Sequence, residues 1–228
     1  MANSQHSRAA ILEAPQPAQG APQSALAGRR QRRAIETRVR LFRCALQLFA
    51  ERGFANVTVE DITEAADVGK GTFFNYFQAK DHVLGVMAEI QLGKIREAVA
   101  RAGERKQPIH AILRNLVRRL AEEPGRSPSL ARALISSFLA SEGVRAIMKI
   151  NVAEGRRMIA GMIAAGQQRG EIDPCLKKEK VAIQFFQAVM GTILIWSLHE
   201  QPPLKTWIED SFQHFWRSIA LSGEKQEP

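Results

Sequence analysis

Polar side chains that can contact nucleic acid cluster in one short segment of the chain. Lys70 and Thr72 open this segment, Asn75 follows, and Lys80 closes it. A lysine can donate to guanine O6 and N7 or pair with a phosphate. A threonine can contact a phosphate or the methyl group of thymine, and an asparagine can address adenine. These residue types predict contact with DNA.

The residues before this segment have the pattern of a helix that ends in a tight turn. Thr58 is a good N-cap, and Asp61 completes a capping-box-like pair with it. Gly69 is expected to supply the backbone freedom for the turn. The helix before the turn has one apolar face, formed by Val59, Ile62, Ala65 and Ala66. A second short helix over residues 70–77 would complete a helix–turn–helix, a unit that presents its second helix to the DNA major groove.

The order of these residues resembles the DNA-binding domain of the TetR family of bacterial repressors. The resemblance covers about residues 35–87, and its motifs are Gly53-Phe54, Thr58-Val59-Glu60-Asp61-Ile62, Val68-Gly69-Lys70-Gly71-Thr72-Phe73-Phe74-Asn75-Tyr76-Phe77 and Lys80. It implies that Lys80 contacts a phosphate. Together with the basic segment described below, the motif predicts ten DNA-binding residues: Arg32, Arg33, Thr58, Lys70, Gly71, Thr72, Phe74, Asn75, Tyr76 and Lys80.

Two positions depart from the family pattern. Phe74 stands where a tyrosine is common, so it can pack on sugar or methyl groups but cannot donate to a phosphate. Gly69 stands where the family often has serine, and it lacks a capping hydroxyl. Phe73 and Phe77 lie one helical turn apart and are expected to be core anchors. For Thr58 the alternative is a cap with no DNA contact.

A basic segment precedes the motif. Residues 1–28 are rich in Ala, Gln, Pro, Gly and Ser, which predicts a disordered arm. Between positions 29 and 52, eight arginines face two glutamates, a balance of 8 − 2 = +6. Such a segment can enter a minor groove or pair with phosphates, although it can also be a solvated basic surface. Removing residues 29–33 is expected to weaken DNA binding.

The rest of the chain predicts an all-α fold, because alternating strand patterns are absent. A helix over residues 33–52 carries an apolar stripe that would pack on the helix–turn–helix, formed by Ile35, Val39, Phe42, Leu46 and Phe49. The three-helix DNA-binding domain is placed at residues 29–80. A larger helical domain for effector binding and dimerisation follows at 81–222, with a disordered tail at 223–228. Further helices are expected over residues 81–103, 109–120, from Ser127 or Ser129 to about 142, 144–168, 177–198 and 204–221.

The family resemblance implies that the second domain binds an effector and dimerises. Apolar residues are the candidate pocket wall, with ordinary core as the alternative: Met87, Leu116, Phe138, Ile147, Met158 and Met162. The last two helices carry apolar residues on more than one face. The dimer interface is therefore predicted from them, with central core again the alternative: Phe185, Val189, Ile193, Trp196, Phe212 and Trp216.

Composition limits the other functional classes. Lys and Arg exceed Asp and Glu by nine, and a pI near 10.1 favours a polyanionic partner, first of all nucleic acid. Cys44 and Cys175 are too few for a disulfide framework, so a reducing cytoplasm is the expected compartment. The sequence indicates neither a membrane span nor a signal peptide. Five dispersed histidines give no metal-site spacing, and neither a catalytic residue nor a cofactor is predicted.

The sequence therefore predicts a sequence-specific transcriptional regulator. The expected mechanism is a dimeric repressor that binds palindromic operator DNA and is released by a small, largely apolar ligand. The alternative is a helical protein that binds a lipid or another small molecule, or an enzyme, with a vestigial DNA-binding motif.

Overall fold

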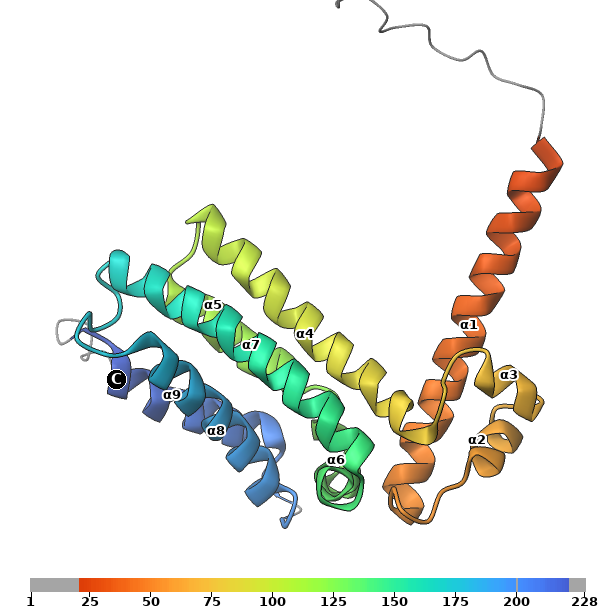
Figure 1. Cartoon of the computed structure of the whole chain (residues 1–228). Coiled ribbons are helices and arrows are strands. Elements are labelled where there is room, and N and C mark those ends of the chain that lie inside the picture. The colour runs from red at the N-terminus through yellow and green to blue at the C-terminus, as the bar shows by residue number, and fades with distance from the viewer. Residues whose placement is uncertain (1–20, 200, 222–228) are drawn as a thin grey trace, which may run out of the picture. The chain divides into compact units, whose positions relative to one another are not determined.

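The computed structural model describes residues 21–199 and 201–221, and every regular element in these ranges is a helix (Figure 1). The β-pairing found there is one isolated bridge between Ile172 and Ala220. The predicted all-α fold is confirmed. Of the two segments predicted to be disordered, 1–20 and 223–228 lie outside the described residues. Residues 21–28 are helical, which corrects the predicted arm at that point.

The helix boundaries follow the predicted ones closely after residue 80. The elements are α1 (Ala21–Arg52), α2 (Val59–Ala65), α3 (Lys70–Phe74), α4 (Lys80–Glu104), α5 (Ile109–Leu120), the 3₁₀ helix η1 (Pro124–Arg126), α6 (Pro128–Ala140), α7 (Glu142–Gln168), α8 (Lys178–Trp196) and α9 (Leu204–Ile219). Of the two serines proposed to begin α6, Ser127 is the N-cap, since its Oγ accepts from the Leu130 N–H at 3.1 Å.

Two compact units divide the chain, residues 1–38 and residues 39–228. Of the first unit, the structure describes residues 21–38, which are the start of α1. Ala, Gln and Arg are good helix formers, and the helix begins well before the predicted position 33. Ile35 has 58% of its surface exposed, and Val39 is exposed as well. The predicted packing stripe is therefore wrong at its N-terminal end. Leu46 and Phe49 are buried, as predicted.

The second unit begins with a small core that holds the helix–turn–helix domain, residues 39–79. Leu41 and Phe49 of α1 are buried together with Ile62 of α2, Phe73 of α3 and Phe77. The same cluster continues into residues of α4, α6 and α7. The helix–turn–helix domain and the helices that follow it therefore share one continuous apolar core.

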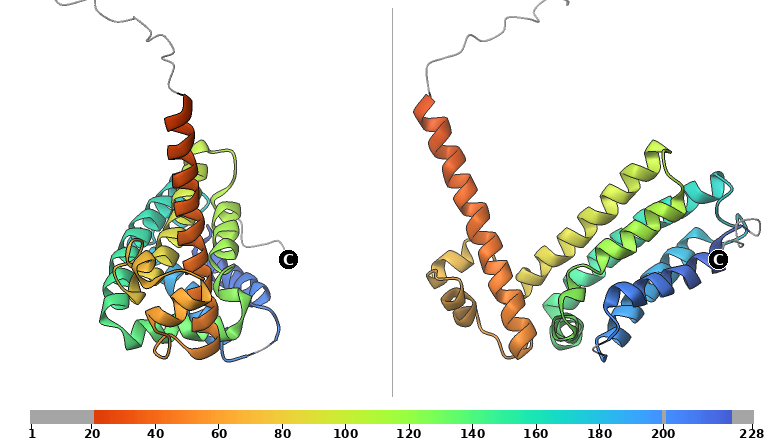
Figure 2. Two further views of the ribbon diagram at one scale, coloured as in Figure 1. Left: turned by 90° about the vertical axis from the view of Figure 1, so that its right-hand side faces the viewer. Right: turned by 180° about the vertical axis from the view of Figure 1, so that it is seen from behind.

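The remaining helices form a bundle, residues 80–221, with a second and larger core. Helix α4 packs along α7 and α5, α7 packs along α8, and α9 lies against α8 and α5 (Figures 1 and 2). Helix α6 crosses one end of this arrangement and contacts α7 and α8. Because α4 belongs to both cores, it connects the helix–turn–helix domain to the bundle.

The start of α7 is joined to the start of α4 by a polar contact. Ser141 caps α7 by accepting from the Val144 N–H at 3.1 Å, and its hydroxyl donates to Asp81 Oδ2 at 2.7 Å. Gly143 lets this carboxylate approach, since a Cβ built at Gly143 would lie 2.4 Å from Asp81 Oδ2. A side chain at position 143 is therefore incompatible with the Ser141–Asp81 bond.

Replacing Gly143 with alanine should destabilise the protein. Because the added methyl group displaces the Asp81 carboxylate, the hydrogen bond from Ser141 breaks, and we expect a loss of about 1 kcal/mol in the free energy of unfolding. Urea denaturation followed by circular dichroism measures this difference.

The matched control is Gly161→Ala in the same helix. A Cβ at Gly161 meets nothing within 4 Å, so alanine should be neutral or stabilise by about 0.5 kcal/mol. Equal stability of the two variants would contradict the proposed role of Gly143.

Candidate nucleic-acid interface and apolar cavity

A capping box begins α2, as predicted. The Asp61 N–H donates to Thr58 Oγ1 at 3.1 Å, and Asp61 Oδ2 accepts from the Thr58 N–H at 2.7 Å and from its hydroxyl at 2.6 Å. These bonds from Thr58, and the nearby Arg52 guanidinium, hold the pKa of Asp61 below its usual value. The carboxylate therefore stays charged at neutral pH and fixes the entry to α2.

The turn after α2 differs from its predicted form. The left-handed residue is Asp67, with φ +49°, whereas Gly69 is extended with φ −70°. The Asp67 N–H donates to the Glu64 carbonyl at 3.0 Å and the Val68 N–H to the Thr63 carbonyl at 3.0 Å, which is a Schellman motif. The assignment of the special backbone conformation to Gly69 was wrong, because aspartate also tolerates the left-handed region.

Helix α3 presents its N-terminal residues outward. Lys70, Gly71 and Asn75 are exposed, Thr72 is half-buried, and Phe74 has 48% of its surface exposed. The helix ends at Phe74, three residues before the predicted end. Gly69 is the N-cap and offers no side-chain hydrogen bond, as its lack of a hydroxyl predicted. The exposed surface combines a cation, polar groups and one aromatic ring.

The aromatic residues of this segment divide between core and surface. Phe73 and Phe77 are buried, and their ring centroids lie 5.3 Å apart, which confirms them as core anchors. Tyr76 is half-buried and packs against the same core. Phe74 contacts Phe73 edge-on and leaves its outer edge to solvent. Of the two aromatics expected at the groove, Phe74 is the more accessible.

The two predicted lysine contacts differ in their surroundings. The exposed Lys70 ammonium pairs with the exposed Glu60 carboxylate of α2. This hydrogen bond is the main cause that lowers the pKa of Glu60. Lys80 donates to the carbonyl oxygens of Phe54 and Val57, both at 2.8 Å, and its Nζ lies 4.4 Å from the centroid of the Phe54 ring. Burial lowers the pKa of Lys80, and at most one of its three N–H groups remains for a phosphate.

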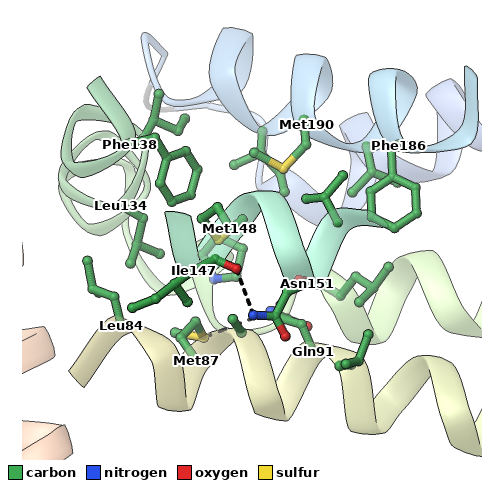
Figure 3. Close-up of a pocket in the computed structure, with 18 of the residues that line it drawn as sticks. Leu84, Met87, Gln91, Leu134, Phe138, Ile147, Met148, Asn151, Phe186 and Met190 are labelled. Carbon is green, nitrogen blue, oxygen red and sulfur yellow. Dashed lines mark hydrogen bonds between the residues drawn. The ribbon is translucent and has the colours of Figure 1, made fainter. Parts of the chain in front are cut away.

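An apolar cavity of about 140 Å³ lies in the bundle between α4, α6, α7 and α8 (Figure 3). Its wall includes Met87, Leu134, Phe138, Ile147 and Met190. Engineered apolar cavities of about 150 Å³ admit benzene-sized molecules. The methionines are flexible, so the cavity can adapt to a larger guest.

Comparisons with known proteins agree with this architecture. Residues 41–87 match the model of the bacterial regulatory proteins of the tetR family. The chain is 24% identical to the transcriptional repressor KstR2 of Rhodococcus jostii (strain RHA1) over 163 residues, which are 70% of this chain and 78% of that protein. These two matches confirm the predicted resemblance to the TetR family.

Two solved TetR-like structures are named for a bound acyl-CoA. FadR of Bacillus subtilis in complex with stearoyl-CoA matches with a TM-score of 0.67 at 18% identity, over 81% of this chain and 98% of that one. The Thermus thermophilus TetR-family repressor FadR in complex with lauroyl-CoA matches with a TM-score of 0.57 at 28% identity, over 78% and 92%. The match over residues 41–87 confirms the predicted class, a DNA-binding transcriptional regulator.

Half of the residues predicted to line a pocket do so. Met87, Phe138 and Ile147 line the cavity. Leu116, Met158 and Met162 do not; Leu116 and Met162 are buried in the larger core, and Met158 packs against it. The predicted set omitted Gln91 and Asn151, the polar residues of the wall. Gln91 lies one helical turn from Met87 and from Ile95. A polar residue within such an apolar row indicates a buried polar side chain, which is the signal that could have found it.

The residues predicted for the dimer interface pack inside the single chain. Between 1% and 8% of each is exposed: Phe185, Val189, Ile193, Trp196, Phe212 and Trp216. This corrects their assignment, because a side chain that fills the core of its own chain offers no surface to a partner. Helix α8 instead exposes Leu194 and Ile195, and Leu198 is exposed just beyond its end.

The described part of the chain contains neither a cluster of metal ligands nor a membrane-spanning helix. Among these residues, no group of three or more His, Cys, Asp or Glu side chains could hold a metal ion. No helix there is long and apolar enough to cross a membrane.

The Lys70–Glu60 pair gives a test of the DNA-facing surface. Because Glu60 competes with a phosphate for the Lys70 ammonium, Glu60→Gln should tighten DNA binding by about threefold to tenfold at low salt. Fluorescence anisotropy titration of a labelled operator duplex measures the change.

Glu64→Gln is the matched control, since it removes the same charge from the exposed surface of α2. It should tighten binding by about twofold or less, through the general charge alone. If both variants change the affinity equally, Lys70 is not the group that meets the phosphate.

Proposed function

We propose that this chain is a repressor that binds palindromic operator DNA as a homodimer and releases it when a small, largely apolar ligand enters the cavity. The observation that carries the proposal is the course of α4. Its first residue, Lys80, holds two carbonyl groups of the helix–turn–helix domain, and Met87 and Gln91 further along line the cavity. A ligand that shifts α4 therefore acts on the DNA-facing domain directly.

The DNA contact is supported by the exposed face of α3. Lys70, Gly71 and Thr72 lie at the N-terminal end of α3, the end that enters a major groove in other helix–turn–helix proteins, and the exposed Asn75 is its C-cap. In our proposal these residues read the bases. Thr58 and the exposed Arg32 and Arg33 are assigned to phosphates.

Dimerisation is proposed through the C-terminal end of α8, by a different surface from the predicted one. Leu194, Ile195 and Leu198 are 43%, 47% and 66% exposed, and apolar side chains of this size gain free energy when a partner covers them. Two copies of α3 held about one DNA turn apart would read a palindrome. A regulator of chromosomal DNA works in the cytoplasm, where we place this protein.

The ligand is proposed from the chemistry of the cavity wall. Carbon and sulfur atoms dominate the wall, which favours an apolar guest. The structural neighbours named for acyl-CoA complexes support an alkyl chain as one such guest. A long acyl chain exceeds a cavity of about 140 Å³, so its entry requires Met87, Met148, Met190 or Phe138 to move.

Selection of genomic DNA fragments by the purified protein tests the function. We expect enrichment of a palindromic site bound by two chains, and release of that site by micromolar lauroyl-CoA. Ala88→Leu narrows the cavity, so it should weaken the response to lauroyl-CoA about tenfold or more and leave DNA affinity unchanged. Sequence-independent binding by the unmodified chain would contradict the proposal and favour a vestigial DNA-binding motif.

The arginines at positions 29, 30, 32 and 33 give a separate prediction. Replacing all four by glutamine keeps good helix formers in α1 but removes four charges. DNA affinity should fall for every sequence, and the slope of log K against log salt should decrease by about 0.9 for each phosphate that the variant no longer neutralises. Affinity measurements between 50 and 200 mM salt, roughly the range over which such ion pairs weaken, check this.

A matched control removes four charges from the bundle instead. Lys177, Lys178, Lys180 and Lys205 are exposed, and their replacement by glutamine should leave the slope nearly unchanged. An equal decrease in both quadruple variants would assign the effect to net charge and not to phosphate pairing by the basic segment.

A further inference from the structure

One amide in the cavity wall has a fixed orientation. The Nε2 group of Gln91 donates to the Leu120 carbonyl at 3.2 Å and to Glu123 Oε2 at 3.3 Å, and it lies 3.9 Å from the Met87 sulfur. All three neighbours are acceptors. Turning the amide over would place its oxygen against a carbonyl and a carboxylate, so the Nε2 group must remain on this side.

The acceptors around Nε2 are themselves held in place. The Lys94 ammonium donates to Glu123 Oε2 at 2.6 Å and to the carbonyl of Arg119 at 2.5 Å. Lys94 is buried, and only 18% of the Glu123 side chain is exposed. A buried ion pair of this kind resists rearrangement, because separating its members leaves a charge without a partner. The orientation of Gln91 is therefore set by the protein before any ligand arrives.

The other end of the same amide has no partner. Gln91 Oε1 is buried and has no hydrogen-bond partner. Among the described side chains, the other buried polar atoms without a partner are Arg169 Nε and Trp207 Nε1. Neither Arg169 nor Trp207 lines the cavity, and neither atom is an acceptor. A buried acceptor without a donor costs about 1–3 kcal/mol, which a suitable guest can recover.

Asn151, the second polar residue of the wall, also uses its N–H donor for a bond within the protein. Asn151 Nδ2 donates to the Ile147 carbonyl at 2.8 Å, within α7 (Figure 3). Its side-chain oxygen takes no part in that bond. No charged residue is found among the described residues that line the cavity. The wall therefore offers acceptor oxygens but no cation for a carboxylate or a phosphate.

We propose that the cavity selects an apolar ligand with a hydrogen-bond donor, an O–H or N–H group, which binds Oε1 of Gln91. The inference rests on the proposed function and narrows its ligand class. Gln91 lines the cavity, and Met87 in the same wall is a flexible side chain whose movement can make room for the guest beside the amide. Gln91 is then the residue that distinguishes an alcohol or amine from a hydrocarbon or an ether of the same size.

A pair of isomers tests this inference. 1-Hexanol and methyl pentyl ether contain the same atoms, but only the alcohol has a donor. Isothermal titration calorimetry with the unmodified protein should show 1-hexanol binding about fivefold more tightly, the ratio that corresponds to one net hydrogen bond of about 1 kcal/mol. In Gln91→Met the two affinities should agree within about twofold.

Gln187→Met is the matched control, since Gln187 is an exposed residue of α8 outside the cavity wall. This variant should keep the preference for the alcohol. If Gln91→Met fails to fold, the comparison of the two isomers in the unmodified protein still tests whether the cavity prefers a hydrogen-bond donor. Equal affinities there, or a preference that persists in folded Gln91→Met, would overturn the inference.

A third probe separates failure of the donor inference from failure of the proposed function. n-Heptane, which has the size of 1-hexanol but no oxygen, serves as the third probe. If n-heptane binds and releases operator DNA as well as 1-hexanol does, the donor inference fails and the ligand-responsive function stands. If none of the three probes, each tested up to its solubility limit, binds the cavity, the donor inference fails. If lauroyl-CoA also leaves the operator bound, the cavity is not the effector site and the proposed function fails as well.

Discussion

The Lys80 ammonium holds the helix–turn–helix domain to the start of α4. The carbonyl groups of Phe54 and Val57 belong to buried residues in the loop before α2, and a buried carbonyl without a donor is costly. Lys80 supplies both donors, although burial disfavours its charged form. The position of this loop relative to α4 depends on these two bonds and on the apolar core that the loop shares with α4. The packing of α2 and the exposure of α3 follow from the position of the loop.

Local patterns in the sequence were sufficient for some features of this domain. The capping box joins Thr58 to Asp61, residues three apart, so it depends on little beyond its own segment. Phe73 and Phe77 follow from helical spacing in the same way. The left-handed residue could not be placed at Asp67, because its location depends on where α2 ends, and both Asp67 and Gly69 are chemically suited to that conformation.

Longer-range features of the bundle were predictable only in part. Periodicity shows which face of a helix is apolar, but not whether that face meets a neighbouring helix or a cavity. Met87 and Met162 both lie on apolar faces, yet only Met87 lines the cavity. Helix α8 is apolar on several sides, so the sequence could not show that Phe185 lies inside the chain and Leu194 outside. These distinctions arise from contacts between segments distant in the chain.

The Lys70–Glu60 pair has a consequence for the thermodynamics of binding. A free lysine that meets a phosphate displaces condensed counterions from DNA, and their release makes binding sensitive to salt. Lys70 instead exchanges the Glu60 carboxylate for a phosphate, and the Glu60 carboxylate, now without its partner, attracts cations from solution. Fewer ions are set free in total. Lys70 can therefore contribute to the geometry of recognition while adding little to its dependence on ionic strength.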